Sequence, residues 1–112
     1  MAETLRPDER IRRRAEYQKI YQDGARFHAR LMTFFILPNR RQGPRLGIAA
    51  TRKLGSAVRR NRAKRLVREL FRRHKPAASC DIVVVPRPEM LSAGFADVEA
   101  DYCAAIRRRV RR

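Results

Sequence analysis

Residues 52–73 read RKLGSAVRRNRAKRLVRELFRR, and this stretch decides how the rest of the chain is organised. It is dense in Lys and Arg with one acid, Glu69, and its apolar residues recur at helical spacing. One face of the expected helix carries Ala63, Leu66, Val67, Leu70 and Phe71, and the opposite face carries Asn61, Lys64, Arg65, Arg68 and Arg72, with Arg62 at its edge. Ser56 is predicted to cap the helix, and Gly55 to let the chain turn into it. We therefore expect an amphipathic helix with one face in a core and a basic face toward an anionic partner.

The whole chain is strongly basic. Its 112 residues include 28 Lys and Arg against 11 Asp and Glu, which gives a net charge of +17. Such self-repulsion opposes compaction and indicates a polyanionic partner, with nucleic acid as the leading candidate and an anionic membrane surface as the weaker one. Most of the cations are Arg, whose planar fork can donate two hydrogen bonds to one phosphate. An apolar content of 44% fits a single domain, residues 1–112, with one modest core.

Several kinds of site and location are disfavoured by the residues present. Cys80 and Cys103 have no CxxC or CxxH neighbours, so we expect two free thiols, buried or half-buried, and no zinc site or disulfide. The first residues, Met1–Glu3, lead into charged residues without an apolar signal region, and nothing approaches a membrane span. We therefore expect a cytoplasmic protein that itself binds neither metal nor cofactor.

Hydrophobic periodicity predicts the element order α-β-β-β-α-β-α. Helices are expected over residues 13–22, 57–73 and 95–109, and strands over residues 25–28, 31–37, 45–51 and 81–86. The last helix should place Phe95, Val98, Tyr102, Ala105 and Ile106 in the core. Residues 1–12 are expected to form a basic, flexible segment, and residues 110–112 a frayed basic end.

The arrangement expected from this order is an α+β sandwich, a small mixed sheet packed by helices. The polar turn at residues 39–44 predicts that strand 45–51 returns antiparallel to strand 31–37. The continuous apolar run DIVVVP at residues 81–86 indicates a strand inside the sheet, parallel to strand 45–51 because a helix separates the two.

Three aromatic residues are candidates for binding bases. Tyr17 and Tyr21 are four residues apart on one helix stripe, and Phe35 lies on the mixed strand face beside Thr33. Rings interleaved with cations are typical of surfaces on which single-stranded nucleic acid stacks. Burial of both tyrosines in the core, with the hydroxyls at its edge, explains the spacing equally well, so both interpretations remain open.

No residue stands out as catalytic. A protein nuclease needs clustered carboxylates that hold metal ions or a histidine acid–base pair. The acids are scattered, His28 is expected to be exposed, and His74 is expected to bind the last carbonyls of its helix. Composition alone therefore fits a subunit of an RNA-processing particle or a ribosomal or chaperone RNA-binding protein. A membrane-surface helix is disfavoured because strands on both sides imply that its apolar face is buried.

Residues 53–69 closely resemble the signature of the bacterial ribonuclease P protein subunit. Its hallmark is an Arg-Asn-Arg triplet, here Arg60-Asn61-Arg62, followed by Lys64-Arg65. The flanking segments EYQKIY at 16–21, RLG at 45–47 and DIVVVPRP at 81–88 also resemble that family. The family usually has Phe where Tyr17 and Tyr21 stand, which should preserve stacking, and commonly has Ser at the position of Thr51.

The resemblance implies an endoribonuclease holoenzyme that removes the 5′ leader from precursor tRNA, in which the RNA subunit carries the catalysis with bound Mg²⁺. The protein would bind the leader and raise the affinity for substrate and Mg²⁺. Its implied partners are one catalytic RNA per protein and precursor tRNA, and neither DNA nor a membrane.

The resemblance also implies roles for individual residues. The catalytic RNA would be contacted by Lys53, Arg59, Arg60, Asn61, Arg62, Lys64, Arg65, Arg68 and Arg72. The leader would be bound by Tyr17, Tyr21, Phe35, Arg14 and Thr51. The implied fold is that of the second domain of a small-subunit ribosomal protein, with a left-handed βαβ crossover, against the general preference for right-handed ones.

Overall fold

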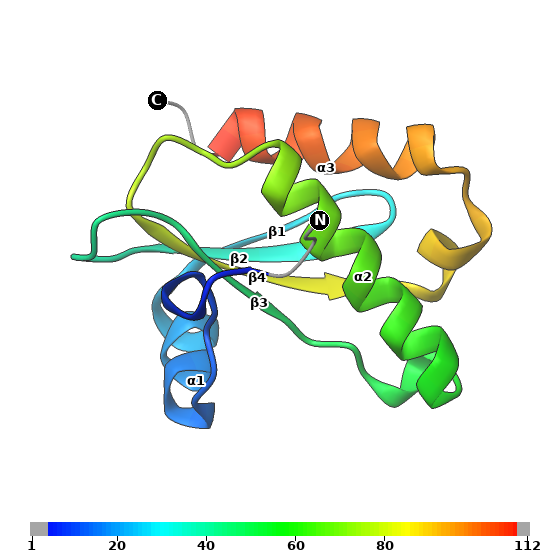
Figure 1. Cartoon of the computed structure of the whole chain (residues 1–112), viewed down its shortest axis with the longest axis horizontal. Helices are drawn as coiled ribbons and strands as arrows, with labels where there is room; N and C mark the ends of the chain where they lie inside the picture. Colours follow the sequence, from blue (N-terminus) through cyan, green and yellow to red (C-terminus); the bar gives the residue numbers. More distant parts are fainter. Residues whose placement is uncertain (1–4, 110–112) are drawn as a thin grey trace.

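The computed structural model describes residues 5–109, so the frayed end expected at 110–112 lies outside the described residues. A four-stranded mixed sheet separates α1 on one face from α2 and α3 on the other (Figure 1). The elements are α1 Arg14–Asp23, β1 Ala25–His28, β2 Met32–Pro38, β3 Arg45–Ile48, α2 Ala57–Arg73, β4 Cys80–Pro86 and α3 Phe95–Arg109, with 3-10 turns η1 Pro7–Glu9, η2 Arg52–Leu54 and η3 Pro88–Ser92. The predicted α+β class and element order are confirmed.

Strand β4 lies inside the sheet, whose order is β1-β2-β4-β3. It pairs antiparallel with β2 and parallel with β3, and its residues Ile82, Val83 and Val84 are fully buried. Strand β3 runs opposite to β2 as predicted, but the two strands do not pair as a hairpin, because β4 is inserted between them. The apolar run of β4 needs cover on both faces, and the central position supplies it.

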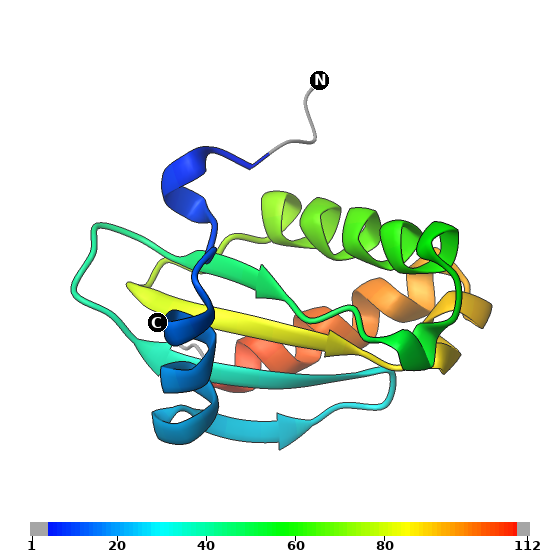
Figure 2. The same ribbon diagram turned by 90° about the horizontal axis from the view of Figure 1, so that it is seen from below.

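The β3–α2–β4 crossover is left-handed, as the resemblance implies. In Figure 2 the face that carries α1 is toward the viewer, β3 lies above β4, and both strands point the same way. Helix α2 packs on the far face of the sheet, where its core contacts lie. The chain therefore runs along β3, returns through α2 behind the sheet and continues along β4, which lies below β3 in this view. This arrangement is a left-handed crossover, which is the uncommon hand.

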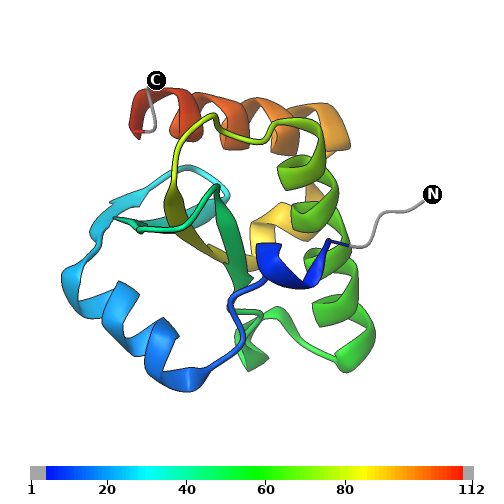
Figure 3. The same ribbon diagram turned by 60° about the vertical axis from the view of Figure 1, so that its left-hand side comes forward.

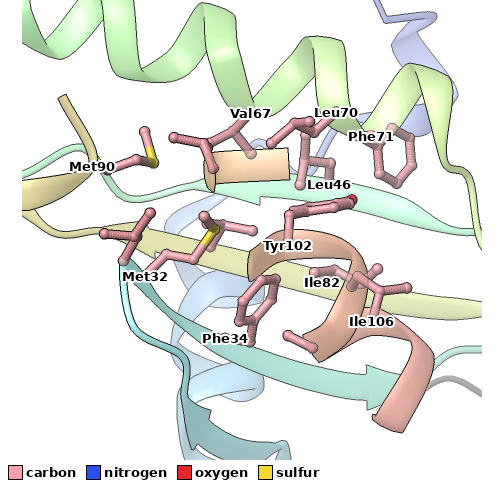
Figure 4. Packing of buried hydrophobic residues seen from close by; sticks show 14 of the residues in the cluster. Met32, Phe34, Leu46, Val67, Leu70, Phe71, Ile82, Met90, Tyr102 and Ile106 are labelled. Atoms are coloured by element: carbon pink, nitrogen blue, oxygen red, sulfur yellow. The ribbon is translucent and has the colours of Figure 1, made fainter. Parts of the chain in front are cut away.

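Helix α2 forms as the residues predict. The Ser56 hydroxyl accepts a hydrogen bond from the Arg59 amide at 3.3 Å, and Gly55 has a φ of 110°, which favours glycine. Its residues Val67, Leu70 and Phe71 are fully buried, together with Ala63. Figure 4 shows Val67, Leu70 and Phe71 facing Leu46, Ile82 and Tyr102 in a core between the sheet, α2 and α3. The apolar face is thus buried within the protein.

Leu70 and Leu66 are expected to differ in their contribution to stability. Leu70 is fully buried, whereas Leu66 is only half-buried at the edge of the core. Leu70→Ala should lower the free energy of unfolding by about 2–5 kcal/mol through lost burial and a residual cavity. Leu66→Ala should lower it by less, because part of that side chain already contacts solvent. Urea denaturation of both variants measures the difference, and equal losses would contradict it.

The N-terminal segment is packed rather than loose over residues 5–12. Leu5 and Ile11 are buried, and the Ile11 amide donates to the Leu46 carbonyl at 3.0 Å. Buried Glu9 is paired with Lys75. Figure 3 shows this segment passing over β3 between α1 and α2. Residues 5–12 are thus packed on the sheet, because their few apolar residues find partners there, and residues 1–4 of the segment expected to be flexible lie outside the described residues.

Two side-chain predictions are also corrected. The His74 ring does not bind helix carbonyls: its Nε2 lies 2.7 Å from Glu99 Oε2 and links α2 to α3. Phe95 is 37% exposed at the start of α3, with the Arg73 guanidinium 5.3 Å from its ring centroid. The free thiols are confirmed, with Cys80 buried and Cys103 half-buried. Among residues 5–109, no helix has both the length and the apolar character that crossing a membrane requires.

Candidate RNA-binding surface

One end of a sheet face is covered by α1, and no other helix within residues 5–109 lies over the rest of that face (Figure 2). A shallow pocket of about 340 Å³ lies on this open part. We call it the aromatic groove, and its lining residues are Tyr21, Arg26, His28, Thr33, Phe35, Ala49, Thr51 and Val85. Three residues that the resemblance assigns to the leader, Tyr21, Phe35 and Thr51, therefore lie together although they come from α1, β2 and the segment after β3.

The rings in the groove form a partly exposed aromatic pair, in which Phe35 is half-buried. Tyr21 packs edge-to-face on Phe35 with centroids 4.8 Å apart, and Tyr21 remains 39% exposed. The Tyr17 centroid lies 6.3 Å from that of Tyr21. Burial raises the pKa of both tyrosines above the ordinary value, so both phenols are neutral at physiological pH. The groove thus offers neutral ring surfaces bordered by cations.

Tyr17 occupies a different position from Tyr21. It is half-buried and lines a second pocket of about 220 Å³, together with Lys64 and Arg68 of α2. A Cβ at Gly47 would lie 2.8 Å from the Tyr17 hydroxyl oxygen, so glycine in β3 is what allows the ring to lie against the strand. Tyr17 is therefore both a packing residue and part of a surface that joins the aromatic groove to α2.

An ion-pair network with two buried members, Arg45 and Asp81, attaches α1 to the sheet through half-buried Glu16. Arg45 donates to both carboxylate oxygens of Asp81, from Nε at 2.9 Å and from Nη2 at 2.8 Å, and Nη1 donates to Glu16 at 3.2 Å. Burial alone would raise the pKa of Asp81, but hydrogen bonds from Arg45 and Asn39 outweigh it and hold the pKa below its usual range. Because Glu16 precedes Tyr17, this network fixes the start of the helix that carries both rings.

The polar residues of α2 differ in what surrounds them: some face solvent and others line the pocket with Tyr17. Arg62 and Arg65 are exposed with Asn61, and Arg60 is half-buried. Lys64 and Arg68 turn toward Tyr17 in the second pocket. We call the set Arg60, Asn61, Arg62, Lys64, Arg65 and Arg68 the basic face.

The remaining residues of the implied RNA contacts lie around this face. The exposed Arg59 donates from Nε to the Leu54 carbonyl at 2.6 Å, and Arg72 pairs with Glu69 at 2.8 Å. Lys53 is exposed in η2. Arg14, the first residue of α1, is exposed and lines neither pocket.

Sequence reasoning missed Arg26 and His28 as groove residues. They alternate with Ala25 and Phe27 along β1, so they share one face of that strand. That alternation was a usable signal. It could not show which face of the sheet the pair occupies, since the pairing of β1 with β2 sets that.

A metal site built from protein groups alone has no support in the described residues. Between residues 5 and 109, no three His, Cys, Asp or Glu side chains come together as metal ligation would require.

Comparison with known proteins identifies the family. The family model described as Ribonuclease P matches residues 5–111. The chain belongs to the ribonuclease P protein family. It is 45% identical over 97 residues to the ribonuclease P protein component of Syntrophus aciditrophicus, and the aligned region covers 85% of this chain and 82% of that protein. It is 35% identical over 107 residues to the component of Chloroflexus aggregans, covering 93% and 79%.

Solved structures of ribonuclease P proteins have the same fold. The protein of Thermotoga maritima superposes with a TM-score of 0.82 at 34% identity, covering 89% of this chain and 96% of that one. The protein of Staphylococcus aureus superposes with a TM-score of 0.83 at 30% identity, covering 91% and 96%. The chain is thus a protein component of ribonuclease P, an endoribonuclease of tRNA processing, and it works with an RNA partner.

Proposed function

We propose that the aromatic groove binds the 5′ leader of precursor tRNA while the basic face of α2 binds the catalytic RNA. The observation that carries this division is the pair formed by exposed Tyr21 and half-buried Phe35, on the sheet face opposite the one that packs against α2. Tyr17 lies between the two surfaces, in one pocket with Lys64 and Arg68. A leader strand bound in the groove would thus continue past Tyr17 toward the catalytic RNA bound on α2.

The chemistry of the groove suits leaders of differing sequence. Stacking on an aromatic ring contributes roughly 1–3 kcal/mol per base and tolerates every base, because each has a π face. The hydroxyl of Thr51 and the guanidinium of Arg26 offer polar contacts to sugar and phosphate at the groove edge. Such a site favours a precursor with a leader over mature tRNA, which has none.

The protein's contribution to the reaction is electrostatic. In the proposed holoenzyme one protein assists one catalytic RNA in the cytoplasm, and the RNA with its Mg²⁺ breaks the phosphodiester bond. Cations beside two polyanions lower their mutual repulsion, which raises the affinity of the RNA for both substrate and Mg²⁺. The net charge of +17 is suited to this task.

The proposal is tested by cleavage of precursor tRNA by the catalytic RNA at low Mg²⁺, with and without protein. We expect the protein to increase cleavage and to bind precursor more tightly than mature tRNA when assembled with the RNA. A ribosomal or chaperone type of RNA-binding protein would give neither result. No gain in cleavage, or equal affinity for precursor and mature tRNA, would overturn the proposal.

Arg65 on the basic face is expected to contribute one phosphate contact to assembly. Arg65→Ala should weaken binding to the catalytic RNA and reduce the slope of log K against log salt by about 1. Arg72→Ala is the matched control on the same helix, because Arg72 is already paired with Glu69 and should change the slope less. Filter binding over a salt series measures both. An unchanged slope for Arg65→Ala with normal folding would show that this arginine is only solvated.

A further inference from the structure

The aromatic groove has two ends with different neighbours. At one end, Tyr17 joins it to Lys64 and Arg68 of α2, and at the other Arg26 and His28 of β1 line it. If α2 binds the catalytic RNA, as in the function proposed above, leader nucleotides next to the cleavage site lie toward α2. Nucleotides further toward the 5′ end then reach β1.

Strand β1 is an open edge of the sheet. It pairs with β2, and no strand within residues 5–109 pairs with its other side. Arg26 and His28 face the groove, whereas Phe27 faces the opposite layer and stacks on Phe34 with centroids 5.2 Å apart. The Arg109 guanidinium lies 4.6 Å from the Phe27 centroid. Cations of β1 and α3 therefore flank both sides of one thin, exposed strand.

These cations are available to a ligand. Arg26 and Arg109 are exposed, and stacking on Phe27 occupies only the flat face of the guanidinium, so its N–H groups can still donate in the plane. Nearby acids are engaged elsewhere. Asp23 pairs with Lys19 at 3.4 Å, and Asp101 accepts from the backbone amides that follow β1. The edge is therefore basic and continuous with the groove.

We propose that the 5′ part of a long leader leaves the aromatic groove across β1, with its phosphates on Arg26 and then Arg109. The occupant is single-stranded RNA, because the path continues a groove whose rings stack bases and because its side chains are cationic. The protein would then contact more of a long leader than the groove alone accommodates. This inference depends on leader binding in the groove.

The test uses the holoenzyme with three substrates: leaderless tRNA, a precursor with a short leader that ends in the groove, and one extended at its 5′ end by about eight nucleotides. Binding of each is measured over a salt series for wild type, Arg109→Gln and Arg107→Gln. Arg107 is the matched control, since it is an equally charged, exposed residue roughly opposite on the last turn of α3. Urea denaturation checks that both variants remain folded.

For wild type we expect tighter binding of the long leader than of the short one, with a salt slope larger by about 0.7 for each added contact. Arg109→Gln should lose the part of this gain in affinity and salt slope that one phosphate contact contributes. It should bind the short leader as wild type does. Arg107→Gln should keep the gain.

Three results would overturn the inference. The first is no gain from the longer leader, and the second is an equal loss in both variants, which would indicate a diffuse charge effect. The third is a loss that Arg109→Gln shows with leaderless tRNA too, which would place Arg109 on the tRNA body. Equal binding of short-leader and leaderless substrates by wild type would instead contradict leader binding in the groove.

Discussion

Arg45→Met is expected to lower the free energy of unfolding by about 3–5 kcal/mol. Methionine fills much of the volume but leaves the Asp81 carboxylate, whose side chain is 9% exposed, without its main partner. It also releases Glu16 and hence the start of α1. Urea denaturation at neutral pH measures the loss. Lys19→Met is the control, because the exposed Lys19–Asp23 pair should contribute no more than about 1 kcal/mol.

The dependence of this loss on pH identifies its cause. In wild type the pKa of Asp81 lies below its ordinary value, so the pair's stabilisation is present above the unfolded pKa, about 3.9, and is lost as pH falls through the folded pKa. In Arg45→Met, the buried and unpaired Asp81 should have a raised pKa and accept a proton more readily. The difference between the two proteins should therefore shrink toward pH 4 and below. A constant difference across that range would assign the loss to packing instead.

Tyr21→Ala is expected to reduce the holoenzyme's preference for precursor over mature tRNA by about 1–3 kcal/mol, roughly 5- to 150-fold. The change removes one stacking ring and the edge-to-face support of Phe35. Stability should change little, since Tyr21 is 39% exposed. Tyr21→Phe is the matched control and should keep the preference, because stacking requires the ring and not the hydroxyl. Competition binding measures the preference, and a preference unchanged in Tyr21→Ala would remove this ring from the leader site.

Tyr17→Ala should behave differently from Tyr21→Ala. Tyr17 is half-buried against Gly47, so its loss should lower the melting temperature by several degrees. It should also lower the preference for precursor over mature tRNA. Binding of the catalytic RNA should remain intact if α2 stays folded. A lower melting temperature with a normal preference would make Tyr17 a packing residue only.

The sequence alone predicted the elements and the faces of its central helix. Residues 56–73 contain their own cap, their own apolar stripe and their own basic face, and all of these depend on spacing within a few turns. The run of β4 likewise indicated burial on both faces. The family followed from residues 53–69, because order along the chain is all that such a motif requires.

Only the tertiary structure decided which residues meet across the sheet. Arg45 meets Asp81 and Glu16 from 36 and 29 residues away, and those contacts require β3 to pair with β4 rather than with β2. The same pairing brings Thr51 to the groove beside Tyr21. Local periodicity tells which side chains are buried, but it carries no information about strand order. That order comes from cooperative packing of segments far apart in the chain, and it places the rings, the basic face and the open edge on one continuous surface.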